Sequence, residues 1–109
     1  MGRCDLPGGT WHACLWTPQG DVVDLGALDE SYSDAWSIND QGEVVGKYYL
    51  NPNWEGARAF LWTRKHGMVD LNTLVEVPDG VILAYANSID DFGWITGMNN
   101  LGTAYLLIP

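Results

Sequence analysis

Short runs of apolar residues recur along this chain, separated by turns that contain Gly, Asn and Asp. In the run 58–63, Phe60 and Trp62 alternate with Ala59 and Leu61, so the two pairs point to opposite faces of a strand. Because both faces are apolar, we expect this strand to lie in a sheet that is covered on both sides. No segment has helical periodicity over about ten residues, and only 71–75 favours a single helical turn.

These patterns return along the chain. The segment WHACLWT at 11–17 returns as ARAFLWT at 57–63 and, less closely, as GTAYLLI at 102–108. A second segment, AWSINDQGEVVG at 35–46, matches ANSIDDFGWITG at 86–97. Regular self-similarity is the sequence signature of a repeat architecture.

The order of the segments predicts the sheets. With the four strands of one unit labelled a to d, the chain reads c-d at 11–26, a-b-c-d at 35–74 and a-b-c at 84–108. The a and b strands are joined by tight turns in which Gly42 and Gly93 are expected at positive φ. We therefore predict one all-β repeat domain, 1–109, with about two four-stranded antiparallel blades of propeller type.

Too few blades are present to close a propeller ring, which takes about four to eight. Fewer than about three repeats generally leave apolar faces uncovered. We expect oligomerisation to complete the structure, so the first predicted partner is a second copy of the chain. Collapse into a compact two-sheet sandwich is the alternative.

The motifs resemble those of the bacterial HAF-repeat family. Its His-Ala-Phe-Leu-Trp strand appears as HACLW at 12–16 and RAFLW at 58–62, and its Val-Asp-Leu strand at 23–25 and 69–71. Its hairpin motif appears as INDQGEVVG at 38–46. The resemblance implies a β-propeller-like repeat from predicted exported proteins, with no established catalytic residues. Cys14 and Tyr105 depart from the family pattern, since each replaces the Phe.

The formal net charge of −9 argues against nucleic acid and anionic membranes as partners, because both attract basic surfaces. No apolar run approaches the length of a membrane span. The N-terminal residues have no apolar stretch like that of a signal peptide. The expectation is either a cytosolic chain or a fragment without its export signal, and the resemblance favours an exported protein.

The two cysteines do not form a disulfide framework. Cys14 stands where Phe60 stands in the next unit, so a buried free thiol that acts as a small apolar side chain is favoured. A Cys4–Cys14 disulfide and a metal-binding role remain open.

The best candidate for a binding site is an insertion between the b and c strands, 47–56. It carries the aromatic residues and amides expected to stack on sugar rings or to anchor a partner protein: Tyr48, Tyr49, Asn51, Asn53 and Trp54. The alternative is that these rings cover a sheet edge or a subunit interface.

The chain offers little for catalysis. Asp24 and Asp70 are equivalent in the two units, and the repeated position favours a structural role in a turn. No nucleophile elbow, phosphate loop or zinc-binding helix is present in the sequence. We predict no catalytic residue, no metal and no cofactor, and hence a non-enzymatic binding or assembly module. The alternative is a hydrolase-like enzyme with an acidic site built from Asp24, Asp70 or the loop 29–34.

Overall fold

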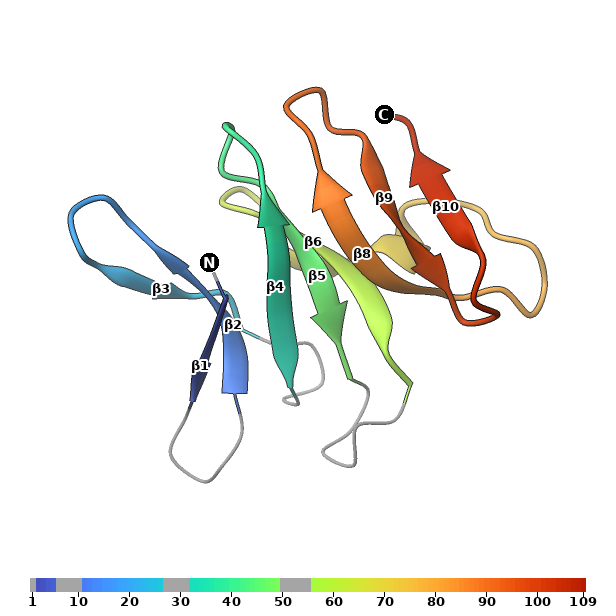
Figure 1. Cartoon of the computed structure of the whole chain (residues 1–109), viewed down its shortest axis with the longest axis horizontal. Helices are drawn as coiled ribbons and strands as arrows, with labels where there is room; N and C mark the ends of the chain where they lie inside the picture. The colour runs from blue at the N-terminus through green and yellow to red at the C-terminus, as the bar shows by residue number, and fades with distance from the viewer. Residues whose placement is uncertain (1, 6–10, 27–31, 50–55) are drawn as a thin grey trace.

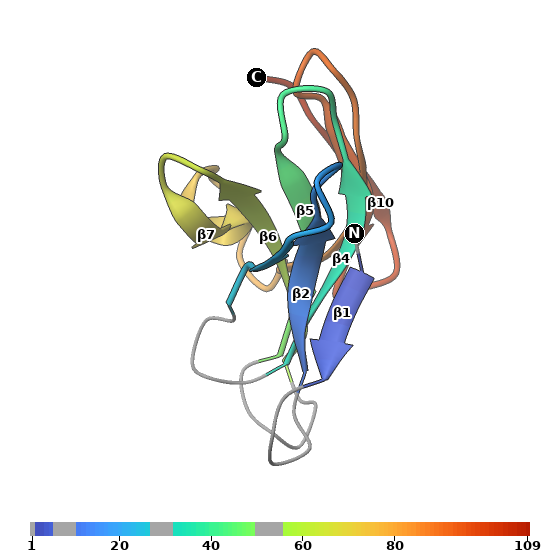
Figure 2. The same ribbon diagram turned by 90° about the vertical axis from the view of Figure 1, so that its left-hand side faces the viewer.

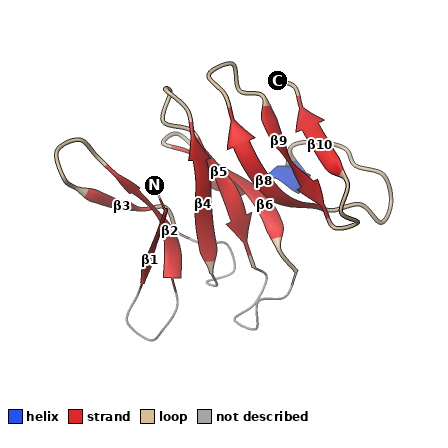
Figure 3. Cartoon of the chain, viewed as in Figure 1, coloured by secondary structure: helices blue, strands red, loops and turns tan. Residues whose placement is uncertain are grey.

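The computed structural model describes residues 2–5, 11–26, 32–49 and 56–109 of the 109-residue chain. The described residues form ten strands in three antiparallel sheets, together with one short 3-10 helix (Figure 3). The predicted all-β class is therefore confirmed. Within these ranges, no helix has the length and apolar character needed to cross a membrane.

The three sheets follow one another along the chain (Figure 1). The first has the order β1 (Gly2–Asp5), β2 (Trp11–Trp16), β3 (Val22–Asp24). The second has β4 (Ser33–Ile38), β5 (Val44–Tyr48), β6 (Arg58–Thr63), β7 (Gly67–Asp70), and is followed by the 3-10 helix η2 (Leu71–Thr73). The third has β8 (Leu83–Ile89), β9 (Ile95–Asn99), β10 (Ala104–Leu107).

Strand registers agree with the sequence matches. In the first sheet Cys14 lies opposite Asp24, and in the second sheet Phe60 lies opposite Asp70. The hairpins β2-β3 and β6-β7 thus pair in the same way, as their apolar spacing predicts. The a-b turns also agree, since Gly42 has φ 77° and Gly93 has φ 85°.

Strand β1 is a feature that the sequence patterns did not predict. It places Gly2 opposite Cys14, just as β5 places Gly46 opposite Phe60 and β9 places Gly97 opposite Tyr105. The first sheet therefore has a b-type strand in addition to the predicted c and d. The segments GRCD of β1, VVGKY of β5 and ITGMN of β9 have only the glycine in common, so β1 gave no pattern to match.

Neighbouring sheets pack against each other, and each apolar cluster lies between two of them. Figure 2 shows β1 and β2 of the first sheet in front of the second sheet. One face of the second sheet, here called the leading face, carries Phe60 and Trp62 and packs on Ala13 of the first sheet. The opposite, trailing face carries Val45 and Ala59 and packs on the third sheet. The third sheet contributes its own leading face to this cluster. Its residues Tyr105 and Leu107 are equivalent to Phe60 and Trp62 of the second sheet.

Gly46 and Gly97 permit a close approach between a and b strands. A β-carbon added at Gly46 would overlap the carbonyl oxygen of Asp34, and one added at Gly97 would overlap that of Tyr85. Both places adjoin a β-bulge in the a strand, where glycine allows another backbone to come close. This contact explains the glycine that ends each Val-Val-Gly or Ile-Thr-Gly segment.

The expectation of a free thiol at Cys14 is wrong, because Cys4 and Cys14 form a disulfide with a Cα–Cα distance of 5.9 Å. Cys4 lies opposite His12, two positions from Cys14, so both cysteines are on the same face of neighbouring strands. The pairing depends on β1, and the sequence patterns contained no evidence of that strand.

We predict that reduction of this disulfide will lower the free energy of unfolding by about 2 kcal/mol, because the bond restricts the unfolded chain and fastens β1 to β2. Chemical denaturation with and without reductant measures the difference. A double variant, Cys4→Ser with Cys14→Ser, is the control and should be insensitive to reductant. Equal stability of the reduced and oxidised protein would contradict the prediction.

Candidate functional site

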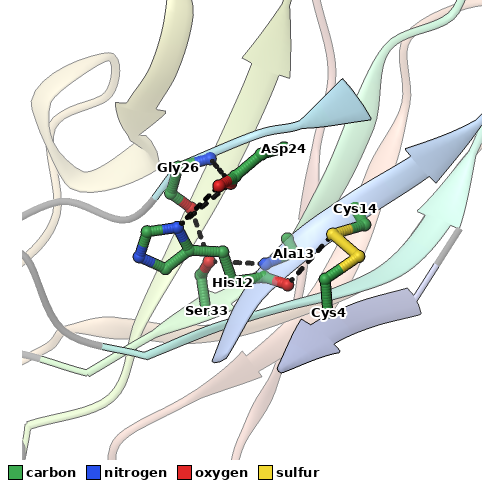
Figure 4. Close-up of polar contacts among 7 residues, drawn as sticks. All are labelled: Cys4, His12, Ala13, Cys14, Asp24, Gly26 and Ser33. Atoms are coloured by element: carbon green, nitrogen blue, oxygen red, sulfur yellow. Dashed lines mark hydrogen bonds and ion pairs between the residues drawn. A yellow bond between two sulfur atoms is a disulfide. The ribbon is translucent and has the colours of Figure 1, made fainter. Parts of the chain in front are cut away.

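The aspartate repeated in the d strands binds local backbone and a basic side chain. In the first sheet, the Asp24 carboxylate lies 3.0 Å from His12 Nδ1, and its Oδ1 accepts a hydrogen bond of 2.7 Å from the Gly26 amide (Figure 4). Ser33 from β4 joins this region to the second sheet, since its hydroxyl donates to Gly26 O and accepts from Ala13 N. Asp24 therefore holds the turn that leaves β3.

Asp70 has the same role with more partners. Its Oδ2 accepts a hydrogen bond of 2.6 Å from the Tyr48 hydroxyl and lies 3.8 Å from Arg58 Nη1. Its Oδ1 accepts from both the backbone and side-chain nitrogens of Asn72, each at 2.8 Å. A carboxylate that caps the first turn of a helix in this way satisfies free amides, and here it caps η2.

The proposed acidic site is not assembled from these two aspartates. Asp24 and Asp70 belong to different sheets, and each is engaged with its own turn. Asp34, the described end of the acidic loop 29–34, lies in β4 opposite Lys47. Within the described ranges, no three His, Cys, Asp or Glu side chains gather to hold a metal ion.

A different pair of carboxylates does meet, where the a-b turns of the second and third sheets touch. Asn39 Nδ2 donates to Asp90 O at 3.0 Å, and the Asp40 amide donates to Asp91 Oδ1 at 2.8 Å. The pKa of Asp40 is raised, first by its side-chain hydrogen bond with Asp91 and then by repulsion between the two charges. Both residues are exposed, so this pair lacks the dry pocket that acid-base chemistry favours.

The sequence-predicted binding residues do not form one surface in the part that is described. Asn51, Asn53 and Trp54 lie outside the described residues. Tyr48 is only 3% exposed and belongs to the apolar cluster between the first and second sheets. Tyr49 is the next residue and is partly exposed. Tyr48 therefore has a structural contact with Asp70, and of the two predicted binding residues that the structure describes, Tyr49 remains a candidate for ligand contact.

Tyr49 takes part in a group of side chains that we call the aromatic–lysine cluster: Trp36, Lys47, Tyr49 and Tyr85. Lys47 Nζ donates to the Tyr49 hydroxyl at 2.8 Å and lies 5.1 Å from the Trp36 ring centroid and 5.5 Å from that of Tyr85. The rings of Trp36 and Tyr85 are stacked, with centroids 5.7 Å apart and an interplanar angle of 12°. An ammonium group over aromatic rings is a favourable electrostatic arrangement.

Sequence reasoning missed Trp36, Lys47 and Tyr85 as members of one site. Trp36 is in β4 and Tyr85 is in β8, so their contact requires the stacking of the second sheet on the third. The only sequence signal was the aromatic content, with six Trp and five Tyr in the whole chain. Trp36 is 38% exposed and gives the cluster a face that a ligand can reach.

Comparisons with protein-family models, with curated proteins and with solved structures find no match to this chain.

We predict that Asp70→Ala will lower the free energy of unfolding by about 2–4 kcal/mol, because it leaves partly buried donors without an acceptor. Asp24→Ala, at a carboxylate that is 50% exposed against 11% for Asp70, should cost only about 1 kcal/mol. Denaturant titration of the two variants tests this order. Equal and small losses would contradict the structural role of Asp70.

Proposed function

We propose that this chain is a non-enzymatic binding and assembly module whose copies associate head to tail. The observation that supports this is the pair of apolar faces at the two ends of the stack. Trp16, on the leading face of the first sheet, is 46% exposed. Leu106 and Met98, on the trailing face of the third sheet, are 48% and 39% exposed.

These end faces are complementary because the chain already joins such faces internally. A leading face packs on the trailing face of the preceding sheet at both internal junctions. In the third sheet, Ala104 and Leu106 are equivalent to Ala59 and Leu61 of the second sheet. Ala59 is fully buried by the next sheet, whereas Leu106 has no such cover among the described residues. A second copy that places its first sheet on the third sheet of the first copy would repeat this packing and bury Trp16.

Association of this kind is heterologous, since different patches meet on the two copies. Heterologous contacts form closed rings when the rotation between copies closes, and open filaments when it does not. A ring of stacked sheets is the architecture of a propeller, which is the arrangement that the resemblance implies. The Cys4–Cys14 disulfide is typical of an oxidising compartment and supports an exported location for such an assembly.

The enzymatic alternative has less support. Asp24 and Asp70 hold turns in separate sheets, and the adjoining carboxylates of Asp40 and Asp91 are exposed. We therefore assign no catalytic residue.

Light scattering tests the assembly. We predict that the wild-type protein is oligomeric at micromolar concentration, while Leu106→Glu and Trp16→Glu are each monomeric because a charge on either face opposes apolar contact. Mixing the two variants should restore a dimer, since each retains the face that the other has lost. A monomeric wild type would refute the proposal. Failure of the mixture to form a dimer would refute the head-to-tail arrangement.

A carbohydrate is the second candidate ligand, and the exposed ring of Trp36 in the aromatic–lysine cluster is the observation that favours it. Aromatic faces bind sugar rings by stacking contacts, and the ammonium group of Lys47 adds a hydrogen-bond donor. The cluster draws these groups from β4, β5 and β8, so the sheet scaffold fixes their positions.

We predict that Trp36→Ala will weaken glycan binding by about 1–3 kcal/mol, the usual effect of removing an aromatic hot spot. Trp94→Ala is the matched control, because Trp94 is 44% exposed and has no contact with the cluster among the described interactions. A glycan array followed by calorimetry of any binder measures the effect. Absence of glycan binding by the wild-type protein would rule out this ligand class.

A further inference from the structure

The third sheet ends in a strand that is paired on one side, whereas the equivalent strands of the other two sheets are paired on both sides. In the first sheet β2 pairs with β1 and β3, and in the second sheet β6 pairs with β5 and β7. Their counterpart β10 pairs only with β9 among the described strands. One side of β10 therefore presents backbone donors and acceptors that can pair with another extended chain.

A cavity of about 550 Å³ opens beside the end of this strand, between the second and third sheets. Its walls are mainly apolar and include Leu61, Leu74, Ile95 and Leu107. Leu74 is 55% exposed, so the cavity is open to solvent. This volume falls in the range of about 300–1,000 Å³ that ligand sites usually have.

The cavity arises from two differences between the second and third sheets. Leu107 occupies the position of Trp62, a residue that is only 8% exposed in the cluster between the first and second sheets. Trp62 also has a cross-strand partner, Met68 of β7, which packs against the same cluster. Leu107 has the smaller side chain, and β10 has no such partner strand among those described.

We propose that β10 binds an extended segment of a partner polypeptide as a fourth strand, and that this segment places a large apolar side chain in the cavity. Residues directly opposite on paired strands point to the same face of a sheet. The residue opposite Leu107 therefore points into the cavity that Leu107 lines, as Met68 points toward the cluster that contains Trp62. Addition of a strand to a sheet edge is an established mode of peptide recognition.

The charges around the cavity define the partner further. Glu43 and Asp91 both line the opening, and Pro109 lies against the turn that carries Asp91, since a β-carbon added at Gly93 would be 3.1 Å from Pro109 Cγ. An antiparallel strand with the register of β7 runs past Pro109 before it reaches Leu107. In this chain the basic pair Arg64 and Lys65 lies in the turn just before β7, four and three residues ahead of Met68. The best-fitting partner thus carries one or two basic residues shortly before its large apolar residue.

This inference extends the proposed binding role to a polypeptide ligand and does not depend on self-association. The probe is a synthetic peptide with the sequence of residues 64–72, which contains both the basic pair and Met68. Fluorescence anisotropy of the labelled peptide should show saturable binding to the wild-type protein. A peptide with Met68→Asp should bind at least about tenfold more weakly, because it puts a charge in an apolar cavity.

The protein variants locate the contact. Leu107→Trp places in the cavity the same indole side chain that Trp62 has at the equivalent position of the second sheet. This variant should keep the wild-type melting temperature, and it should bind the peptide about tenfold or more weakly. The double variant Asp91→Asn with Glu43→Gln keeps the side-chain shapes and removes both negative charges. It should bind the peptide more weakly than the wild type, and its affinity should change less with salt concentration. Leu106→Glu, on the other face of β10, is the control and should bind the peptide normally even when self-association is lost.

Four results would overturn the proposal. The first three are absence of saturable peptide binding, equal affinity for the Met68→Asp peptide, and unchanged affinity of a folded Leu107→Trp variant. Loss of binding in Leu106→Glu with normal binding in Leu107→Trp would place the peptide on the outer face and would also overturn it. The comparison between the two peptides leaves the protein unchanged, so it remains decisive if a protein variant does not fold.

Discussion

Contact between neighbouring sheets is the interaction on which the rest of this structure depends. Neither apolar cluster belongs to one sheet; each combines a trailing face with the leading face that follows. A sheet that is apolar on both faces leaves apolar surface in water unless neighbouring sheets cover it, and burial of that surface is the main favourable contribution to folding. The aromatic–lysine cluster, the turn contact at Asp40 and Asp91 and the cavity beside β10 all lie where two sheets meet. The stacking therefore creates the candidate sites as well as the core.

The sequence was sufficient to predict most of the strands because their apolar alternation is strong on both faces. Phe60 and Trp62 alternate with Ala59 and Leu61, and this pattern correctly indicated a sheet covered on both sides. The Asn-Asp-x-Gly turn likewise required positive φ at Gly42. Strand β1 lacks these signals, because it has only four residues and shares only its glycine with the other b strands. Without β1 the disulfide partner of Cys14 was not evident, and the free thiol was the simpler interpretation.

The candidate sites were less predictable because they depend on distances between residues that are remote in sequence. Tyr48 and Tyr49 are adjacent in the chain, yet Tyr48 binds Asp70 in the core while Tyr49 binds Lys47. Periodicity predicts that neighbours in a strand face opposite ways, but it does not show which neighbour the next sheet covers. The cavity is similar, since it follows from a Leu at the position of Trp62 and from the lack of a partner strand on one side of β10 among the described strands. Composition alone contains neither fact.

The disulfide between Cys4 and Cys14 also has a mechanical consequence. It connects β1 covalently to the next strand across a sequence separation of ten residues. If tension is applied to the N-terminal residue, the covalent link transmits the force from Cys4 directly to β2 at Cys14, and the chain between the two cysteines carries no force. The hydrogen bonds between β1 and β2 then bear little of the load. Oxidation thus shortens the length of chain that pulling can extract from the first sheet, because the residues between the two cysteines no longer contribute to it.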